Sequence, residues 1–294
     1  MVKYPRVLVL GSTGMVGHQL CIYLINKSNY ILFDVARSSK FRSQTKLVDV
    51  IDERKLCKYI KNINPDYIIN CIGVLINGSN KNIENAVLIN SHLPHMLARI
   101  ASEINSTLIH ISTDCVFSGK KGGYVETDHR DGVGTYAQTK ILGEVCDNKN
   151  LTLRTSVIGP EIRSNGEGLF HWFMKQGGSV QGFTKAIWSG VTTIELAKAI
   201  KWSIDKNITG LYHVTNNLSI NKHYLLQLFK KYTKKNINIE SFDGKIVDKS
   251  FIDTRLLLGY KIPSYDEMIS DMVSLILNNR SLYSQYKDLS FEKE

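Results

Sequence analysis

The sequence lacks the features that would tie it to a membrane, a metal or an oxidising compartment. Its five cysteines are scattered and odd in number, so a disulfide framework is not expected. No Cys/His cluster has the spacing of a zinc site. No apolar run approaches the ~20 residues of a membrane-spanning helix, and the N-terminus has no signal-peptide pattern. We therefore expect a soluble, cytoplasmic protein with no membrane partner and no metal.

The composition argues against a disordered chain and against a nucleic-acid-binding protein. Hydrophobic residues make up 43% and charged residues 22% of the 294 positions, which excludes a mostly disordered chain. The length allows one large domain or two unequal lobes. A formal charge of +10 indicates an anionic partner, which could be nucleic acid, a membrane or a small phosphate ester. Because the basic residues are spread along the chain and no nucleic-acid motif is present, we expect no nucleic-acid partner.

The first half of the chain alternates short apolar runs with helical patterns. The five apolar runs cover residues 6–10, 30–35, 67–71, 107–112 and 151–155. Strands separated by helical patterns predict βαβ units, and hence a parallel sheet with helices on both faces. The expected fold class is α/β, with a Rossmann-like doubly wound sheet.

The pattern loosens after residue 160, which predicts a second, smaller lobe. We expect residues 1–160 and about 183–215 to form the dinucleotide-binding domain. Residues 161–182 and about 216–294 would form a C-terminal α/β lobe for the substrate. The polar, charged tail after residue 277 is expected to fray.

A glycine-rich loop follows the first apolar run and opens the first helical pattern. Its glycines are spaced GxxGxxG, which suits a tight turn, close approach to a pyrophosphate and close helix–strand packing. The helix N-terminus would add free N–H groups for the phosphates. The cofactor-binding residues predicted here are Gly11, Ser12, Thr13, Gly14, Met15, Val16 and Gly17.

The second apolar run ends near residues that bear on the cofactor. Asp34 would accept hydrogen bonds from ribose hydroxyls, which favours NAD. Arg37 would pair with a 2′-phosphate, which favours NADP, so the preference stays open. Asp49 and Val50 would either border the adenine or, for the carboxylate, mark the start of a helix.

A tyrosine and a lysine stand four residues apart in a helical pattern. Tyr136 and Lys140 would share one helix face. The ammonium would lower the pKa of the phenol, and the phenol would exchange a proton with a carbonyl oxygen as hydride is transferred. Upstream, Thr113 ends the fourth apolar run, at the sheet edge where ligands of open α/β sheets bind.

Six segments occur in the order found in extended short-chain dehydrogenase/reductases: GSTGMVG, STDCVFSG, ETD, TYAQTK, RTSVIG and GLYHV. The chain resembles the sugar-nucleotide 4-keto reductases of that family, including the dTDP-4-dehydrorhamnose type. The resemblance implies a catalytic set of Thr113, Tyr136 and Lys140, with Lys140 holding the ribose of NADP(H) or NAD(H). It also implies that Cys71, Ile72, Gly73 and Asn90 line or support the cofactor. A nucleotide sugar is the expected substrate, linked to either UDP or dTDP, and a homodimer is one option for the assembly.

One departure from the reductase pattern points to a second activity. Cys115 stands where reductases of this type usually have an aromatic residue. GDP-fucose synthase, a more distant resemblance, has an epimerase cysteine two residues after its catalytic hydroxyl. By that resemblance Cys115 and His171 would move a proton at C3, next to the ketone. The alternative is that Cys115 is a small buried residue and that His171 packs beside Trp172.

The substrate lobe offers charged and aromatic candidates that could equally be solvated charges or core residues. A diphosphate favours Arg or Lys, and a nucleobase favours an aromatic surface. The candidates are Arg163, His171, Lys175, Lys185 and Trp188. A further alternative is a non-catalytic subunit, resembling the regulatory subunit of methionine adenosyltransferase, although intact Thr113, Tyr136 and Lys140 argue against it.

Overall fold

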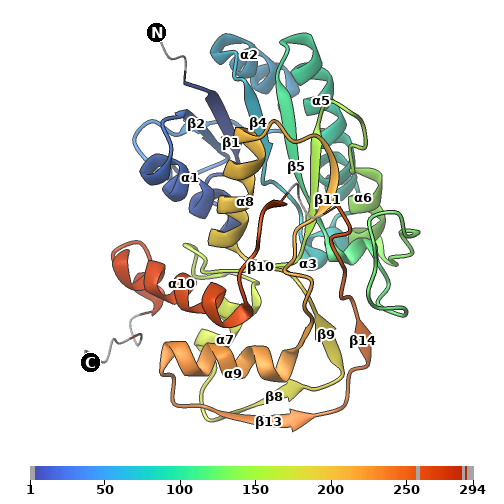
Figure 1. Ribbon diagram of the computed structural model, residues 1–294. Coiled ribbons are helices and arrows are strands. Elements are labelled where there is room, and N and C mark those ends of the chain that lie inside the picture. Colours follow the sequence, from blue (N-terminus) through green and yellow to red (C-terminus); the bar gives the residue numbers. More distant parts are fainter. Residues whose placement is uncertain (1–3, 256–258, 287–288, 290–294) are drawn as a thin grey trace.

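A parallel sheet of seven strands forms the centre of the molecule (Figure 1). The computed structural model describes residues 4–255, 259–286 and 289. The strand order is β11-β6-β5-β4-β1-β2-β3, and every pairing in this sheet is parallel. The strands are β1 Arg6–Leu10, β2 Ile31–Ala36, β3 Lys46–Leu47, β4 Tyr67–Asn70, β5 Thr107–Thr113, β6 Leu151–Thr155 and β11 Gly210–His213. The order reverses between β1 and β4, and open α/β sheets bind ligands at such a switch point.

Helices cover both faces of this sheet, as the alternating pattern predicted. Helices α1 (Met15–Lys27) and α8 (Thr193–Asp205) pack together on one face. Helices α2 (Glu53–Ile63) and α5 (Leu93–Glu103) contribute to a separate core on the other face. A π-helical segment, η1 (Val87–His92), precedes α5 and contacts α6 (Thr135–Leu142). The short helices α3 (Ile76–Lys81) and α4 (Ile83–Ala86) precede η1.

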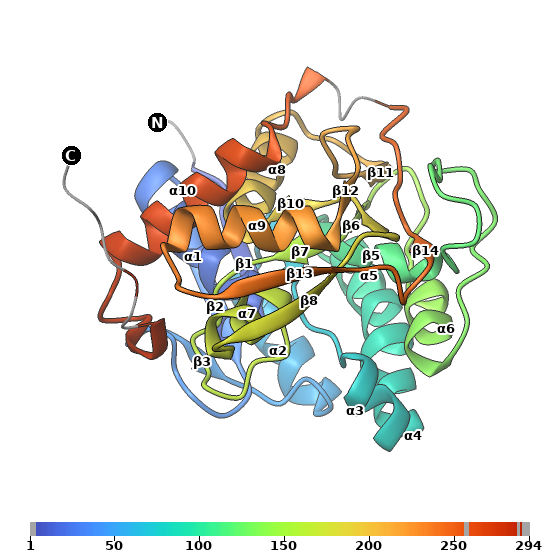
Figure 2. The ribbon, with the colours of Figure 1, turned by 90° about the horizontal axis from the view of Figure 1, so that it is seen from below.

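A smaller lobe lies beyond the carboxyl ends of the strands (Figures 1 and 2). Its strands form two small sheets, β13-β8 and β12-β9-β14, and β10 (Val191–Thr192) pairs with β7 (Val157–Ile158). The lobe contains α7 Leu169–Lys175, β8 Ser179–Phe183, β9 Ala186–Trp188, β12 Ile220–Asn221, α9 Lys222–Thr233, β13 Asn238–Phe242, β14 Val247–Asp248 and α10 Tyr265–Asn278. Strand β9 pairs with β12 and β14 inside the lobe, and the chain next joins the large sheet at β11.

One hydrophobic core runs from the large sheet into the lobe. It joins sheet residues such as Val7 and Ile109 to Phe170 of α7, Phe229 of α9 and Met272 of α10. Burial of apolar surface is the main favourable term in folding. The shared core therefore fixes the lobe relative to the sheet.

The segment after α10 packs against the protein instead of fraying, as far as it is described. Tyr283 and Tyr286 are buried. Tyr283 donates to Nε2 of His18 in α1 over 2.9 Å, and Tyr286 packs edge-to-face on Phe170. The expectation of a frayed tail was wrong for this segment, because two tyrosines, five and eight residues beyond the helix, give too short an apolar pattern to recognise. Residues 287–288 and 290–294 lie outside the described residues.

Phe229 tests the importance of this shared core. It is fully buried and contacts the rings of Phe170 and Phe173 at centroid distances of 5.3 and 5.6 Å. Phe229→Ala should lower the free energy of unfolding by about 3–5 kcal/mol, measured by chemical denaturation. Tyr224→Ala, on an exposed position of the same helix, should change it by less than about 0.5 kcal/mol. Equal effects of the two variants would contradict the shared core.

Candidate active site

The glycine-rich loop forms a tight turn between β1 and α1. The N–H groups of Gly11 and Ser12 both donate to the carbonyl of Val35, over 2.9 and 3.0 Å. Gly11 has a φ of +87°, which favours glycine. A Cβ on Gly17 would lie 2.1 Å from the carbonyl oxygen of Gly11. The loop and the first turn of α1 therefore touch backbone to backbone.

The start of α1 is left open for an anion. Its N-cap is Gly14, and no side chain caps the helix. N–H groups at a helix N-terminus with no cap attract anionic groups such as phosphates. Arg163, which the sequence placed in the substrate pocket, reaches this loop and donates to the hydroxyl of Thr13 over 2.9 Å. The structure thus adds a guanidinium to the phosphate loop, from a segment 150 residues away.

Asp34 is already engaged by neighbouring side chains. Its carboxylate is buried and accepts from Nε of Arg42 and from the hydroxyl of Thr45, both over 2.6 Å. Arg37, just beyond β2, is exposed. The negative charge expected to bind ribose is therefore balanced within the protein, and the exposed Arg37 follows directly after the strand that carries it.

Asp49 does not mark the start of a helix. The N-cap of α2 is Asp52, which accepts from the N–H of Lys55. Asp49 is exposed and accepts from the N–H of Ile51 over 3.1 Å, and Val50 is buried.

Asn90 holds the loop that follows β4, which contains Cys71, Ile72 and Gly73. Its Oδ1 accepts from the N–H of Val74 over 2.8 Å, and its Nδ2 donates to the carbonyl of Val74 over 3.0 Å. The same Nδ2 donates to the hydroxyl of Thr139 in α6 over 3.2 Å. π-Helical segments like the one carrying Asn90 are frequent at functional sites. Asn90 thus joins the cofactor-side loop to the helix of Tyr136 and Lys140.

Thr113 and Tyr136 meet at the end of β5. The side chain of Thr113 lies close enough to the phenol of Tyr136 to influence its pKa. Thr113 also donates to Oδ1 of Asp114 over 3.0 Å and accepts from the N–H of Cys115 over 3.1 Å. Burial raises the pKa of Tyr136, and the charges of Cys115 and Asp114 raise it further, whereas the Thr113 hydrogen bond opposes them. The phenol therefore stays protonated at neutral pH.

Lys140 points toward β5 and not toward the phenol. Its ammonium donates to the carbonyl of Ile111 over 2.8 Å and lies 3.5 Å from Nε2 of His110. Burial lowers the pKa of Lys140 to about 8, while Glu144 opposes that shift. The sequence predicted that Lys140 would lower the pKa of Tyr136. In the structure burial is the largest influence on the phenol and acts in the opposite direction.

Cys115 lies beside Thr113 and Tyr136, and we call these three residues the β5-end cluster. Its thiol lies close enough to Asp114, Lys249 and Tyr136 for their electrostatic influence on one another to be felt. Burial and Asp114 raise the pKa of Cys115 to about 11, and Lys249 opposes them. The structure therefore brings Thr113, Cys115 and Tyr136 together, as the sequence predicted, with the thiol protonated.

His171 lies outside the β5-end cluster. It is buried in the lobe, where Nε2 donates to the carbonyl of Ser164 over 3.1 Å and Nδ1 accepts from the hydroxyl of Tyr286 over 2.7 Å. Both ring nitrogens thus have protein partners, which argues against His171 as a proton-transfer group. The nearby Trp172 is largely exposed.

The remaining candidates for substrate binding have different surroundings in the structure. Trp188 is buried, donates to the hydroxyl of Ser156 over 2.7 Å and packs against Tyr265. Lys175 donates to the carbonyl of Ser164, and Lys185 forms an exposed ion pair with Asp243.

Sequence reasoning missed two lysines near Cys115. Lys249 lies close enough to the thiol to influence its pKa. Lys222, the first residue of α9, places Nζ 5.1 Å from the centre of the Trp188 ring. Its place at the first residue of a helix, where a cation is disfavoured, is the signal that could have singled it out.

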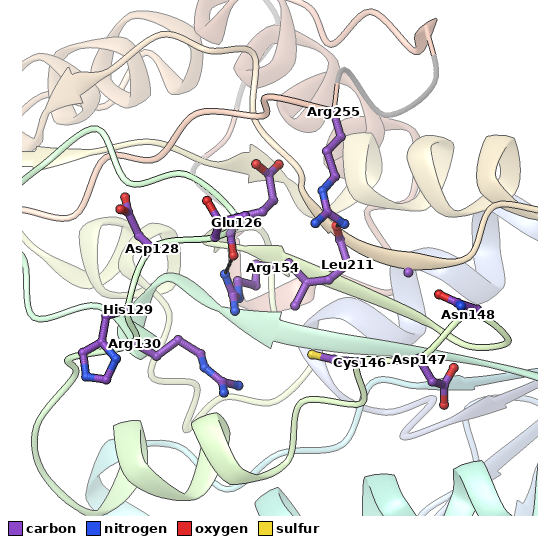
Figure 3. Close-up of a pocket in the computed structure, with 12 residues that line it drawn as sticks. Glu126, Asp128, His129, Arg130, Cys146, Asp147, Asn148, Arg154, Leu211 and Arg255 are labelled. Atoms are coloured by element: carbon purple, nitrogen blue, oxygen red, sulfur yellow. Dashed lines mark hydrogen bonds between the residues drawn. The ribbon is translucent and has the colours of Figure 1, made fainter.

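The hollow shown in Figure 3 is separate from this cluster. Its volume is about 470 Å³, and residues from the loop after β5, from the α6–β6 connection and from β11 line it. Around it, the carboxylate of Glu144 accepts from Arg154 over 2.7 Å and from Arg130 over 2.9 Å. Because these buried charges already satisfy one another, we interpret the network as structural.

Among the described residues, no group of three or more His, Cys, Asp or Glu side chains could hold a metal ion. No helix of the described ranges is long and apolar enough to cross a membrane.

Comparisons with known proteins agree with this architecture. A family model described as the RmlD substrate binding domain matches residues 5–243. A dTDP-4-dehydrorhamnose reductase of Salmonella typhimurium is 27% identical over 247 residues, 80% of each chain. The Escherichia coli (strain K12) protein of that name is 31% identical over 157 residues, 51% of this chain and 50% of the relative.

Solved structures give the same result. A hypothetical dTDP-4-dehydrorhamnose reductase from Sulfolobus tokodaii has a TM-score of 0.75 and 26% identity, over 89% of this chain and 98% of that one. The Bacillus anthracis enzyme, solved in complex with NADP, has a TM-score of 0.78 and 22% identity, over 93% of this chain and 100% of that one. With the family model covering most of its length, the chain belongs to the RmlD substrate-binding-domain family.

Proposed function

We propose that this chain reduces the C4 ketone of a nucleotide-linked 4-keto-6-deoxy sugar with a nicotinamide cofactor. The observation that carries the proposal is the juxtaposition of Thr113 and Tyr136 at the carboxyl edge of the sheet, with Lys140 one turn further along the helix of Tyr136. Support comes from the relatives named dTDP-4-dehydrorhamnose reductase. Biosynthesis of deoxysugars for surface polysaccharides is the corresponding role.

The residues present fit a dinucleotide cofactor. The backbone contact between Gly11 and Gly17 leaves no room for side chains, as a pyrophosphate cradle requires. The uncapped start of α1 and the guanidinium of Arg163 would hold the two phosphates. Lys140 and the loop fixed by Asn90 would hold the nicotinamide ribose. When bound, the cofactor supplies the hydride.

Charge at the end of β2 favours NADP(H) over NAD(H). Arg42 neutralises Asp34, so a 2′-phosphate would not face an unbalanced carboxylate. Arg37 is exposed beside it and would pair with that phosphate. Structures with a similar fold have been solved with NADP and with NAD.

Tyr136 would act as the proton donor to the C4 oxygen. Its raised pKa keeps the phenol protonated, which is the form that reduction consumes. The hydroxyl of Thr113 would orient the same oxygen. Intact contacts among these groups favour an enzyme over a non-catalytic regulatory subunit.

A second activity at the same centre would be epimerisation at C3. Cys115 contacts Thr113 and acts on Tyr136, so its thiol borders the position of a bound ketone. A proton at C3 is acidified by the adjacent C4 carbonyl, and a nearby acid or base can exchange it. The substrate would be UDP-linked with an acetamido group at C2, or dTDP-linked as in 4-keto-rhamnose.

Tyr136→Phe tests the proton donor. Loss of the general acid should lower kcat for ketone reduction by about 10²–10⁴-fold, while the Kd of NADPH stays within about twofold. The measurement is NADPH oxidation with freshly generated UDP- and dTDP-linked 4-keto-6-deoxy sugars. Tyr224→Phe, at an exposed tyrosine, serves as the matched control. A Tyr136→Phe enzyme with full turnover would remove Tyr136 from the mechanism.

Arg163→Met tests the phosphate loop. Removing a charge-assisted contact should raise the Kd of NADPH by about tenfold or more, because such bonds contribute about 1.5–3 kcal/mol. Isothermal titration would measure it, with Arg99→Met at an exposed arginine of α5 as the control. An unchanged Kd would return Arg163 to the substrate or to a structural role.

Arg37→Ala tests the cofactor preference. Loss of a 2′-phosphate contact should lower the ratio of kcat/KM for NADPH to that for NADH by about tenfold or more. The absolute value with NADH should change little. A ratio that does not move would show that Arg37 does not recognise the 2′-phosphate.

A further inference from the structure

Three arginines line the hollow shown in Figure 3, and one carboxylate serves two of them. Glu144 accepts from Nε and Nη2 of Arg154 over 2.7 and 2.8 Å, and from Nη1 of Arg130 over 2.9 Å. Arg255 lines the same hollow and forms no ion pair with any described residue. The three guanidinium groups therefore carry more positive charge than Glu144 balances.

Arg130 and Arg255 each keep one edge of the guanidinium group without a partner among the described residues. Arg130 donates only through Nη1, to a main-chain carbonyl and to Glu144. Arg255 also donates only through Nη1, to the carbonyl of Leu211 over 2.6 Å. Nε–H and Nη2–H form the parallel pair with which an arginine holds two oxygens of a phosphate or carboxylate, and Arg154 uses that pair on Glu144. The corresponding pairs of the other two arginines stay open.

The acidic side chains around the hollow are engaged by other groups. The carboxylate of Glu126 accepts from the hydroxyl of Thr254 over 2.6 Å, and that of Asp128 accepts from the ammonium of Lys121 over 2.6 Å. Asp147 accepts from two N–H groups of its own loop over 2.9 and 2.7 Å. Figure 3 shows the carboxylates of Asp128 and Asp147 turned away from the guanidinium groups. An anion in this hollow would therefore compete with no unpaired carboxylate of the residues that line it.

Hydrogen bonds hold the arginines on different walls of the hollow. Arg130 comes from the loop after β5 and is joined to Arg154 of β6 through Glu144. Arg154 donates to the carbonyl of Glu126 over 3.1 Å, and the carboxylate of Glu126 holds the segment of Arg255 through the residue before it. In Figure 3 the guanidinium of Arg154 lies between those of Arg130 and Arg255. Two open edges on either side of Arg154 suit a ligand with two anionic groups better than a single phosphate.

The hollow has room for more than a bare ion. Its volume of about 470 Å³ lies within the roughly 300–1,000 Å³ of small-molecule sites. It borders β6 and β11, at one side of the sheet, and it is lined by none of the residues of the β5-end cluster. A molecule bound here would therefore leave the reacting groups free.

We propose that this hollow binds a small molecule that carries a diphosphate group, with the open edges of Arg130 and Arg255 each holding one phosphoryl group. A diphosphate fits because its two phosphoryl groups are adjacent, and each offers the paired oxygens that a guanidinium edge binds. The formal charge of +10 indicates an anionic partner of this kind. The site goes beyond the proposed function, because it lies outside the cofactor and sugar sites and the family match does not assign it.

Inorganic pyrophosphate is the probe, and the Nε–H signals of arginine locate it. The full-length chain is labelled with ¹⁵N-arginine and titrated with pyrophosphate at constant ionic strength, because salt screens exposed charges. Spectra of Arg130→Met and Arg255→Met assign the two signals. Both signals should shift with one Kd, about tenfold or more below the Kd of inorganic phosphate, because pyrophosphate engages a second charge-assisted contact.

Three variants separate bidentate binding from a general attraction of anions. Arg255→Met should raise the Kd of pyrophosphate, followed at the Arg130 signal, by about tenfold or more. Arg255→Lys keeps the charge but lacks the paired donors, so its Kd should rise nearly as much. Arg99→Met, at an exposed arginine of α5, should leave the Kd within about twofold. The Kd of NADPH should not change in any of the three.

The results that would overturn the proposal are distinct from those that support it. Signals that do not shift, or a Kd that Arg255→Met leaves unchanged, would overturn it. Equal affinity for phosphate and pyrophosphate would also overturn it, since one phosphoryl group would then suffice, and full affinity in Arg255→Lys would reduce the site to general charge attraction.

UDP distinguishes the two sources of a diphosphate group. A shift of the same two signals with UDP supports an esterified diphosphate as the occupant, and no shift with UDP beside a shift with pyrophosphate supports the free ion. Because the readout involves no turnover, none of these results depends on whether the chain reduces a sugar.

Discussion

The side-chain amide of Asn90 is the interaction on which the arrangement of the site depends. Its oxygen accepts from the N–H of Val74, and its nitrogen donates to the carbonyl of Val74 and to the hydroxyl of Thr139. A buried amide is costly unless it is hydrogen-bonded, so this side chain tolerates few other geometries. The loop after β4 and the helix of Tyr136 are therefore fixed relative to each other.

The packing around Asn90 places a second constraint on the same helix. A Cβ on Gly143 would lie 1.8 Å from the carbonyl oxygen of Asn90, so the end of α6 can approach η1 only with glycine there. Because α6 carries Tyr136 and Lys140 only a few residues earlier, this approach also sets where the phenol and the ammonium lie. The orientation of the site thus depends on Gly143, a residue that has no side chain to take part in the reaction.

The sequence predicted well what depends on neighbours along the chain. Alternating runs identified the strands of the sheet, and the glycine spacing identified the turn before α1, since both follow from local backbone needs. Distant contacts were not predictable in this way. Arg163 on the phosphate loop and Tyr286 on His171 join segments that are 150 and 115 residues apart, and only the fold brings them together.

The C-terminal segment after α10 links the two ends of the site. Tyr283 hydrogen-bonds His18 and Gln19 in the phosphate-loop helix, and Tyr286 bonds His171 and the N–H of Glu161 in the lobe. His18 in turn donates to the carbonyl of Gly14 at the N-cap of α1. Sub-global opening follows such contiguous units. Release of this segment would therefore loosen the nucleotide side and the sugar side together, so the two halves of the site share one unit of local stability although they lie in different lobes.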